Sequence, residues 1–303
     1  MLVDIALAAC AIHLLHIHTL PTFLLSQILL TLFYFHNFAL LHECGHGNVH
    51  AKRWINNVIG HYASIFCFMP FFPWKLIHQQ HHLYTGNIDL DPTMKALREM
   101  REKGKISLLI RVCWQRWIPM AALTQHFVFW FYPLTLWKEK KMVRETFLQS
   151  AFSVGLLAAV YIALFHFFPD TINLGNLWLS FVLYLVMTEM VNLPHHVMLP
   201  SFHTSKERNK LHPWEQNITT RSCYYAFGLS ELLTLNFNLH TEHHFFPNLP
   251  WYRLRKLRHL LKPSLGDEYN EVTGIRWNLS NRSRDISDVL LPELPHPLFN
   301  VQE

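Results

Sequence analysis

The chain has 303 residues, of which 50% are hydrophobic and only 16% are charged, and its mean hydropathy is +0.10. Soluble domains usually carry about 25% charged residues, so this composition disfavours a soluble protein and indicates a membrane protein. The net charge of +5 is modest and forms no compact basic stripe. It argues against nucleic-acid binding and fits a protein that faces anionic lipid headgroups.

The first half of the chain predicts one transmembrane hairpin followed by interfacial segments. Residues 2–19 and 23–41 are apolar and flank a turn at residues 20–22. A membrane span needs about 20 apolar residues, so the two runs fit a hairpin. Residues 55–77 are apolar but interrupted by prolines, which predicts a buried or interfacial segment. Residues 106–137 are aromatic-rich with scattered polar residues, which predicts interfacial helices.

The second half predicts another hairpin and a polar region. Residues 147–168 form the strongest candidate span, and residues 176–191 form a second span after a short turn. The chain after about residue 197 is much more polar. Residues 251–263 form a basic amphipathic stretch, which predicts a helix on the headgroup surface.

Positive charge predicts the orientation of these hairpins. Lys52, Arg53, the basic run at residues 138–144 and the basic tail are expected on the cytoplasmic side. We therefore predict an all-α integral membrane protein with about four transmembrane helices, interfacial helices and a cytoplasmic helical cap. The prediction is one domain, residues 1–303, made of a first hairpin (1–41), a histidine-rich part with interfacial segments (42–146), a second hairpin (147–194) and a cytoplasmic region with the basic tail (195–303).

Histidine is the unusual residue, with 22 copies, and nine of them fall into four ordered clusters. Residues i, i+3 and i+4 share one face of a helix, so each cluster can direct its imidazoles to one place. The predicted orientation puts every cluster on the cytoplasmic side. The clusters are HxxxH (His42, His46), HxxHH (His78, His81, His82), NxxxH (Asn192, His196) and a second HxxHH (His240, His243, His244).

The first cluster by itself reads H-E-x-x-H, the signature of a zinc metalloprotease in which Glu43 would be the general base. That interpretation uses three protein ligands and leaves six histidines unexplained. Alternatively, Glu43 is only a polar residue at a helix end. For the protein as a whole, a non-enzymatic metal-handling function is a further alternative. Nine imidazoles fit two metal ions with four or five ligands each, although residue type alone does not name the metal. His195 adjoins His196 and could replace it.

The series HxxxH, HxxHH and HxxHH, followed by HHFFPNLP, resembles the membrane fatty acid desaturases and their hydroxylase relatives over about residues 41–257. The resemblance implies two iron ions in an all-histidine site at the cytoplasmic face. It implies that His196 is a ligand in preference to His195, and that Asn192 acts through a water molecule. The dimetal centre itself would be the catalyst, with no separate acid or base. Zinc competes for such ligands and can replace iron in purified protein.

The resemblance also implies O2 as co-substrate and a fatty acyl substrate, held as free acid, acyl-CoA, acyl-carrier protein or lipid. No HPGG-like haem-binding motif occurs in the chain. We therefore expect a separate electron donor, such as ferredoxin or cytochrome b5 with its reductase. Desaturation is the first prediction. Hydroxylation and oxidative decarboxylation to a terminal alkene follow from the same hydrogen abstraction and stay as alternatives.

Two aspartates follow the second cluster in TGNIDLDP, and two roles are open for them. Asp89 and Asp91 could orient ligand histidines, or they could act in a turn or helix cap. The five cysteines are odd in number and form no C-x-x-C pair, so they are interpreted as reduced packing residues.

Overall fold

The computed structural model describes residues 2–102, 104, 108–138, 143–205, 208–225, 230–290 and 294. Most of the basic run at residues 138–144 lies outside the described residues, as does the end of the basic tail.

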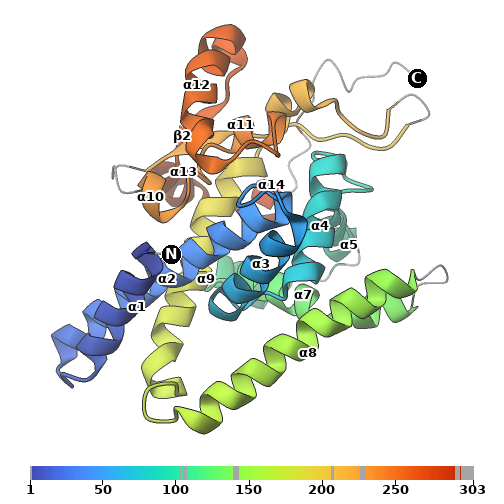
Figure 1. Cartoon of the computed structure of the whole chain (residues 1–303). Coiled ribbons are helices and arrows are strands. Elements are labelled where there is room, and N and C mark those ends of the chain that lie inside the picture. Colours follow the sequence, from blue (N-terminus) through green and yellow to red (C-terminus); the bar gives the residue numbers. More distant parts are fainter. Residues whose placement is uncertain are drawn as a thin grey trace. The chain divides into compact units, whose positions relative to one another are not determined.

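The described chain is mostly helical, in keeping with an all-α membrane protein (Figure 1). Two short strands, β1 (Ser222–Tyr224) and β2 (Glu271–Thr273), pair in parallel with Cys223 opposite Val272. The helices are α1 (Leu2–Leu15), α2 (Leu20–His46), α3 (Arg53–Cys67), α4 (Phe71–Tyr84), α5 (Pro92–Glu102), α6 (Leu108–Gln115), α7 (Met120–Lys138), α8 (Arg144–Phe167), α9 (Leu174–His196), η1 (Pro213–Ile218), α10 (Ser230–Leu233), α11 (His240–Phe245), α12 (Trp251–Leu265), η2 (Gly266–Glu268), α13 (Gly274–Asn281) and α14 (Ile286–Leu290).

The chain divides into two compact units, and the division passes through α4 and α9. Unit 1 contains residues 1–75, 121–188 and 233–235. Unit 2 contains residues 76–120, 189–232 and 236–303. Unit 1 therefore holds most of the long apolar helices, and unit 2 holds the short polar elements of the second half.

Three described helices, α2, α8 and α9, are long and apolar enough to cross a membrane. Helix α1 is apolar but has only 14 residues. At 1.5 Å per residue it is about 21 Å long, which is shorter than the roughly 30 Å hydrocarbon core. The interfacial segment expected at residues 106–137 forms two helices, α6 and α7, and the segment expected at 55–77 forms α3 and the start of α4.

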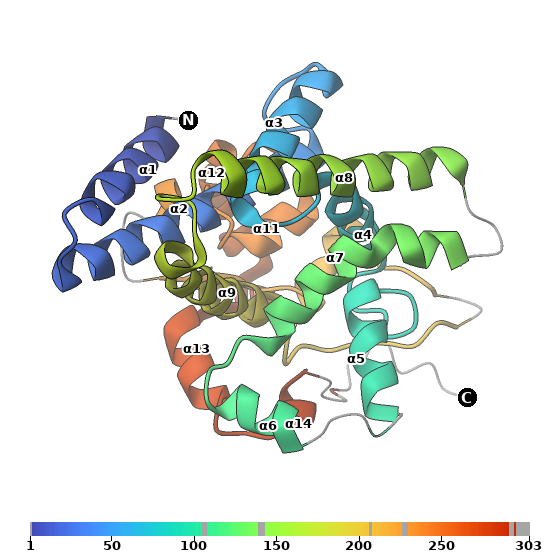
Figure 2. The same cartoon turned by 90° about the horizontal axis from the view of Figure 1, so that it is seen from below.

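In unit 1, helices α1 and α2 form a hairpin (Figure 2). Thr19 caps α2, because its hydroxyl accepts from the backbone N–H of Thr22 and the Thr22 hydroxyl accepts in return from the N–H of Thr19. The charged Asp4 of α1 is buried, and its carboxylate accepts from the side-chain amide of Asn37 at 3.2 Å. A buried charge needs such partners, so this contact explains how an aspartate is tolerated in an apolar helix.

A buried amide on α2 ties that helix to the first half of α9. Gln27 donates to the backbone carbonyl of Asn176 at 2.9 Å and accepts from the backbone N–H of Ser180 at 2.9 Å. Hydrogen bonds between apolar helices add directional contacts that hydrophobic packing lacks. This pair of bonds fixes the register between the two helices.

In unit 2, the C-terminal helices pack against α6 and the end of α9. Their apolar core contains Trp114, Val197, Trp277 and Val289. Arg282 donates to the Glu189 carboxylate at 2.7 Å, and its guanidinium lies 4.0 Å from the centre of the Trp114 ring. Removing one partner of such a buried pair leaves an uncompensated charge, so this contact holds the C-terminal helices to the last turns of α9.

Candidate metal centre

Four elements carry the clustered histidines. His42 and His46 end α2 and belong to unit 1. The other seven belong to unit 2, where they come from α4, the last turn of α9 and the short helix α11. Each cluster lies on a helix, as the i, i+3 and i+4 spacings predict.

In unit 1, His42 and His46 lie one turn apart with ring centres 4.8 Å from each other. Gly47 ends the helix in the left-handed conformation, with φ of 80°. Gly45 has a different reason to be glycine, because a Cβ atom there would lie 2.6 Å from the indole of Trp74. Glu43 is buried, and its carboxylate lies 3.6 Å from Nδ1 of His42.

In unit 2, the four-histidine group (His81, His196, His240, His244) has ligand atoms that all lie within 4.8 Å of one another. Nε2 of His196 lies 2.8 Å from Nε2 of His240 and 3.1 Å from Nε2 of His81. Nε2 of His244 lies 3.2 Å from Nε2 of His240. Nitrogens that bind one metal at about 2.1 Å lie roughly 3 Å apart in neighbouring coordination positions. The spacing of this group therefore fits one ion.

A second gathering in unit 2 is the three-histidine group (His78, His82, His243). Nε2 of His82 lies 3.0 Å from Nε2 of His78 and 3.0 Å from Nε2 of His243. The rings of His82 and His244 stack with centres 4.1 Å apart, so the two groups are neighbours. Unit 2 thus contains two neighbouring groups of imidazoles whose spacing suits metal binding.

The outward ring nitrogens of three histidines have fixed partners. Nδ1 of His81 lies 2.9 Å from an Asp91 oxygen, and Nδ1 of His244 lies 2.8 Å from Oε1 of Gln216. Nδ1 of His196 lies 3.3 Å from the carbonyl oxygen of Thr219. Because each partner is an acceptor, Nδ1 carries the proton and Nε2 keeps its lone pair for a metal.

The structure separates the two aspartates that the sequence left open. Asp91 orients His81 and also caps α5, since its other oxygen accepts from the backbone N–H of Thr93 at 3.0 Å. Asp89 contacts Arg98 and accepts from the backbone N–H of Thr204 at 2.8 Å. Asp91 therefore has both proposed roles, whereas Asp89 holds loops together.

Two residues around the groups carry no signal in the sequence motifs. Gln216 in η1 donates through Nε2 to the backbone carbonyl of His82 at 3.0 Å while its Oε1 accepts from His244. We call HxxxH, the first HxxHH and the second HxxHH the first, second and third histidine boxes. Glu242 lies inside the third box and is fully buried. It accepts from Ser222 at 2.6 Å and from Tyr269 at 2.5 Å. Burial raises the pKa of Glu242, and the two hydrogen bonds oppose that shift.

The structure places His195 and His196 differently. His196 contributes to the four-histidine group, and Asn192 lies one turn before it on α9. His195 is fully buried and stacks on His240 with ring centres 4.2 Å apart. Neither ring nitrogen of His195 has a hydrogen-bond partner among the described residues. His195 thus packs against a candidate ligand.

The protonation of the site suits metal binding. Burial lowers the pKa of His244 well below its ordinary value, and the imidazoles of His82 and His240 lower it further. The histidine is therefore neutral at physiological pH, which is the form that ligates a metal. Neutral imidazoles bind zinc, copper, iron and nickel, so the donor set fits a transition metal and disfavours calcium or magnesium.

Comparison with known proteins identifies the family of the chain. The chain is similar to an sn-1 oleoyl-lipid 12-desaturase of a Picosynechococcus species, with 27% identity over 86% of this chain and 73% of the relative. It is similar to sn-1 acyl-lipid omega-3 desaturases (ferredoxin) of a Nostoc species, with 24% identity over 79% of this chain and 67% of the relative, and of a Synechocystis species, with 25% identity over 77% and 65%. A model of the fatty acid desaturase family matches residues 18–275. The chain is therefore an oxidoreductase of the fatty acid desaturase family.

Proposed function

We propose that this protein desaturates a fatty acyl chain with two iron ions and O2. The iron ligands would be nine imidazoles, with Asn192 acting through a water molecule. Seven of them come from unit 2, and the HxxxH pair at the end of α2 supplies the other two. The proposed ligands are His42, His46, His78, His81, His82, His196, His240, His243 and His244.

One observation carries this proposal, namely the two adjacent imidazole groups of unit 2. Nε2 of His196 lies 2.8 Å from Nε2 of His240 and 3.1 Å from Nε2 of His81. A single-zinc protease needs three protein ligands and would leave most of this arrangement without a purpose. Two neighbouring metal ions would use all the imidazoles of the two groups.

The metals, when bound, supply the strong oxidant that an unactivated C–H bond requires, because acid–base side chains cannot remove such a hydrogen. The protein side chains do the rest: burial and neighbouring imidazoles keep His244 neutral, while Asp91 orients His81 and Gln216 orients His244. Desaturation removes two hydrogen atoms, that is two protons and two electrons, from the acyl chain, and O2 needs four electrons and four protons to become two waters. Two further electrons and two protons must therefore enter from outside.

We further propose that two hairpins enter the membrane, namely α1 with α2 and then α8 with α9, which follow each other after a short turn, with the histidines at the cytoplasmic side. All four clusters lie at or beyond the helix ends that the positive-inside rule assigns to the cytoplasm. The substrate class we propose is an acyl chain esterified in a membrane lipid, because the relatives are named as acyl-lipid desaturases. The electron source we propose is a separate one-electron donor, and two relatives are named for ferredoxin.

Product analysis tests the function. Cells expressing the chain or its His244→Ala variant, with ferredoxin and its reductase supplied, are analysed by gas chromatography and mass spectrometry of lipids and headspace. An internal alkene found only with the unmutated chain supports desaturation. A hydroxy acid would indicate a hydroxylase, and a volatile alkene one carbon shorter would indicate a decarboxylase.

Metal analysis of the purified protein supplies the second criterion. About two metal ions per chain, lost together in His244→Ala, support the dinuclear site. One metal per chain, with activity abolished by Glu43→Gln and retained in His244→Ala, would overturn the proposal in favour of a protease. Zinc in the preparation decides nothing by itself, since zinc competes for imidazole ligands.

A further inference from the structure

Helix α12 carries an unbalanced positive charge. Its sequence, WYRLRKLRHLLKPSL, contains five lysines and arginines and no acidic residue. Glu231 pairs with Arg255, and Glu271 pairs with both Arg258 and Lys262. Arg253 and Lys256 are exposed and have no ion pair among the described residues. The acidic Asp267 and Glu268 lie beyond the C-terminal end of the helix, in η2.

The apolar face of α12 is already covered by the protein. Leu254 is 2% exposed, and Leu257 and Leu261 are half-buried on the same side. A helix that lies in a membrane surface buries its apolar face in the lipid, so that face would have to be free. On the exposed side of α12, Tyr252 and Leu260 are the only large apolar residues, and they lie between the cations. We call the exposed side of the helix, with Tyr252, Arg253, Lys256 and Leu260, the outward face of α12. This face therefore suits a charged protein surface better than a bilayer.

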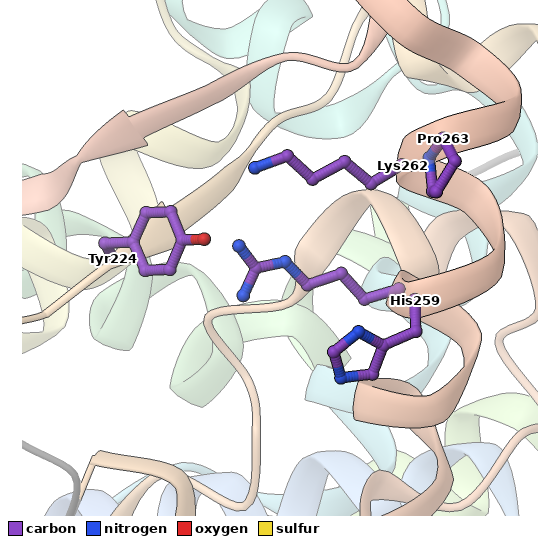
Figure 3. Close-up of a pocket in the computed structure, with 5 residues that line it drawn as sticks. Tyr224, His259, Lys262 and Pro263 are labelled. Atoms are coloured by element: carbon purple, nitrogen blue, oxygen red, sulfur yellow. The ribbon is translucent and has the colours of Figure 1, made fainter.

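A recess of about 440 Å³ lies between α12 and Tyr224. Figure 3 shows Lys262 extending from the helix towards the Tyr224 ring, with His259 lower on the same helix. The guanidinium of Arg258 lies 4.3 Å from the centre of the same ring. Glu271 balances one of the two cations in the recess, which leaves a surplus of one positive charge for an incoming carboxylate.

The same helix lies next to the third histidine box. Helices α11 and α12 are in contact and are joined by the short segment from Phe246 to Pro250. The side-chain amide of Asn236 donates to the backbone carbonyl of Trp251 at 2.9 Å, which fixes the start of α12. A protein bound on α12 would therefore sit beside the helix that carries His240, His243 and His244.

We propose that the outward face of α12, with the Tyr224 recess, is the docking surface for a soluble, acidic one-electron donor protein. The inference rests on the proposed function, in which two electrons enter from outside for each double bond formed. The donor delivers them one at a time and is oxidised twice, while O2 and two protons from water complete the two water molecules. Redox partners form small, electrostatically steered interfaces of this kind.

The test measures binding and turnover separately, using the full chain in phosphatidylcholine nanodiscs and an acidic [2Fe–2S] ferredoxin as the probe. The charge-reversed variant is Arg253→Glu with Lys256→Glu. The matched control is Arg276→Glu with Lys210→Glu, which reverses one arginine and one lysine, both exposed, elsewhere in unit 2. We expect about a tenfold rise in the ferredoxin Kd for the α12 variant only, and a weaker dependence of Kd on ionic strength.

In turnover, the α12 variant should show a raised KM for ferredoxin and an unchanged kcat at saturating ferredoxin. Equal losses in both double variants, or no loss in the α12 variant, would overturn the docking surface. A third outcome would also overturn it: the α12 variant keeps its ferredoxin affinity, but its nanodiscs no longer sediment with phosphatidylglycerol vesicles. In that case α12 would contact lipid. Binding needs no product, so absence of desaturation in the unmutated chain would count against the proposed function and leave the binding result intact.

Discussion

Gln216 and His244 lie 28 residues apart in the chain, yet Oε1 of the glutamine is 2.8 Å from Nδ1 of the histidine. The other end of the same amide donates to the backbone carbonyl of His82. One side chain therefore fixes the ring of a histidine in the third box and the backbone of the second. This relationship gives the two HxxHH boxes a common reference in unit 2.

Replacing Gln216 by leucine should weaken the site without unfolding the protein. Leucine keeps the volume but leaves Nδ1 of His244 without its acceptor, so the ring loses its fixed tautomer. Loss of such a partner typically lowers metal affinity or activity by about 10–100-fold. Metal content per chain and product formation measure the effect. Gln216→Glu, which restores an acceptor, should recover more activity than leucine, and equal activity of the two variants would contradict this role.

Asp91→Asn should reduce activity by a similar factor of about 10–100. The amide is a weaker acceptor than the carboxylate, so His81 is held less firmly in the tautomer that ligates through Nε2. Asp89→Asn is the control, because it makes the same charge change two residues away, where the side chain contacts Arg98 and Thr204. A larger loss of metal in Asp89→Asn than in Asp91→Asn would show that the loop, and not the His81 contact, is what matters.

The histidine groups could be predicted from the sequence because their spacing alone aligns them on helix faces. The partners of those histidines could not. Gln216 lies in a 3-10 turn with no motif of its own, and Glu242 is buried by contacts from Ser222 and Tyr269, which are distant in sequence. Such contacts depend on tertiary packing. A weak signal existed only for Asp91, whose position after the second box left its two roles undecided until the structure showed both.

For the membrane segments too, some features could be predicted from the sequence and others could not. The three long apolar helices were predictable from hydropathy and length. The shortness of α1 and the burial of Asp4 against Asn37 were not, because they depend on how α1 packs on α2. The basic stretch at residues 251–263 forms a helix as predicted, but its leucine face contacts protein. Periodicity reveals an apolar face and does not say what covers it.

His195 and His196 provide a test within one turn of α9. His196→Ala should abolish product formation and lower the metal content, because it removes a proposed ligand from the four-histidine group. His195→Phe should keep most of the metal, since an aromatic ring can still stack on His240. Metal analysis and single-turnover assays of both variants decide the matter. Complete metal loss in His195→Phe, with retention in His196→Ala, would reverse the assignment.

Gly45→Ala should destabilise the protein even though alanine is the better helix former. Alanine in a helix interior is ordinarily favoured over glycine by about 1 kcal/mol. Here the new Cβ would lie 2.6 Å from the indole of Trp74, and overpacking of this kind costs about 1–3 kcal/mol. Thermal unfolding in detergent, together with metal content, measures the net effect at the end of α2, where His42 and His46 lie.

Two further variants serve as controls. Trp74→Phe should partly rescue Gly45→Ala by removing the ring that clashes. Gly155→Ala on α8, where a Cβ meets no atom within 4 Å, should leave stability unchanged or raise it. If both alanine variants behaved alike, contact with Trp74 would not be the reason for a glycine inside the first histidine box.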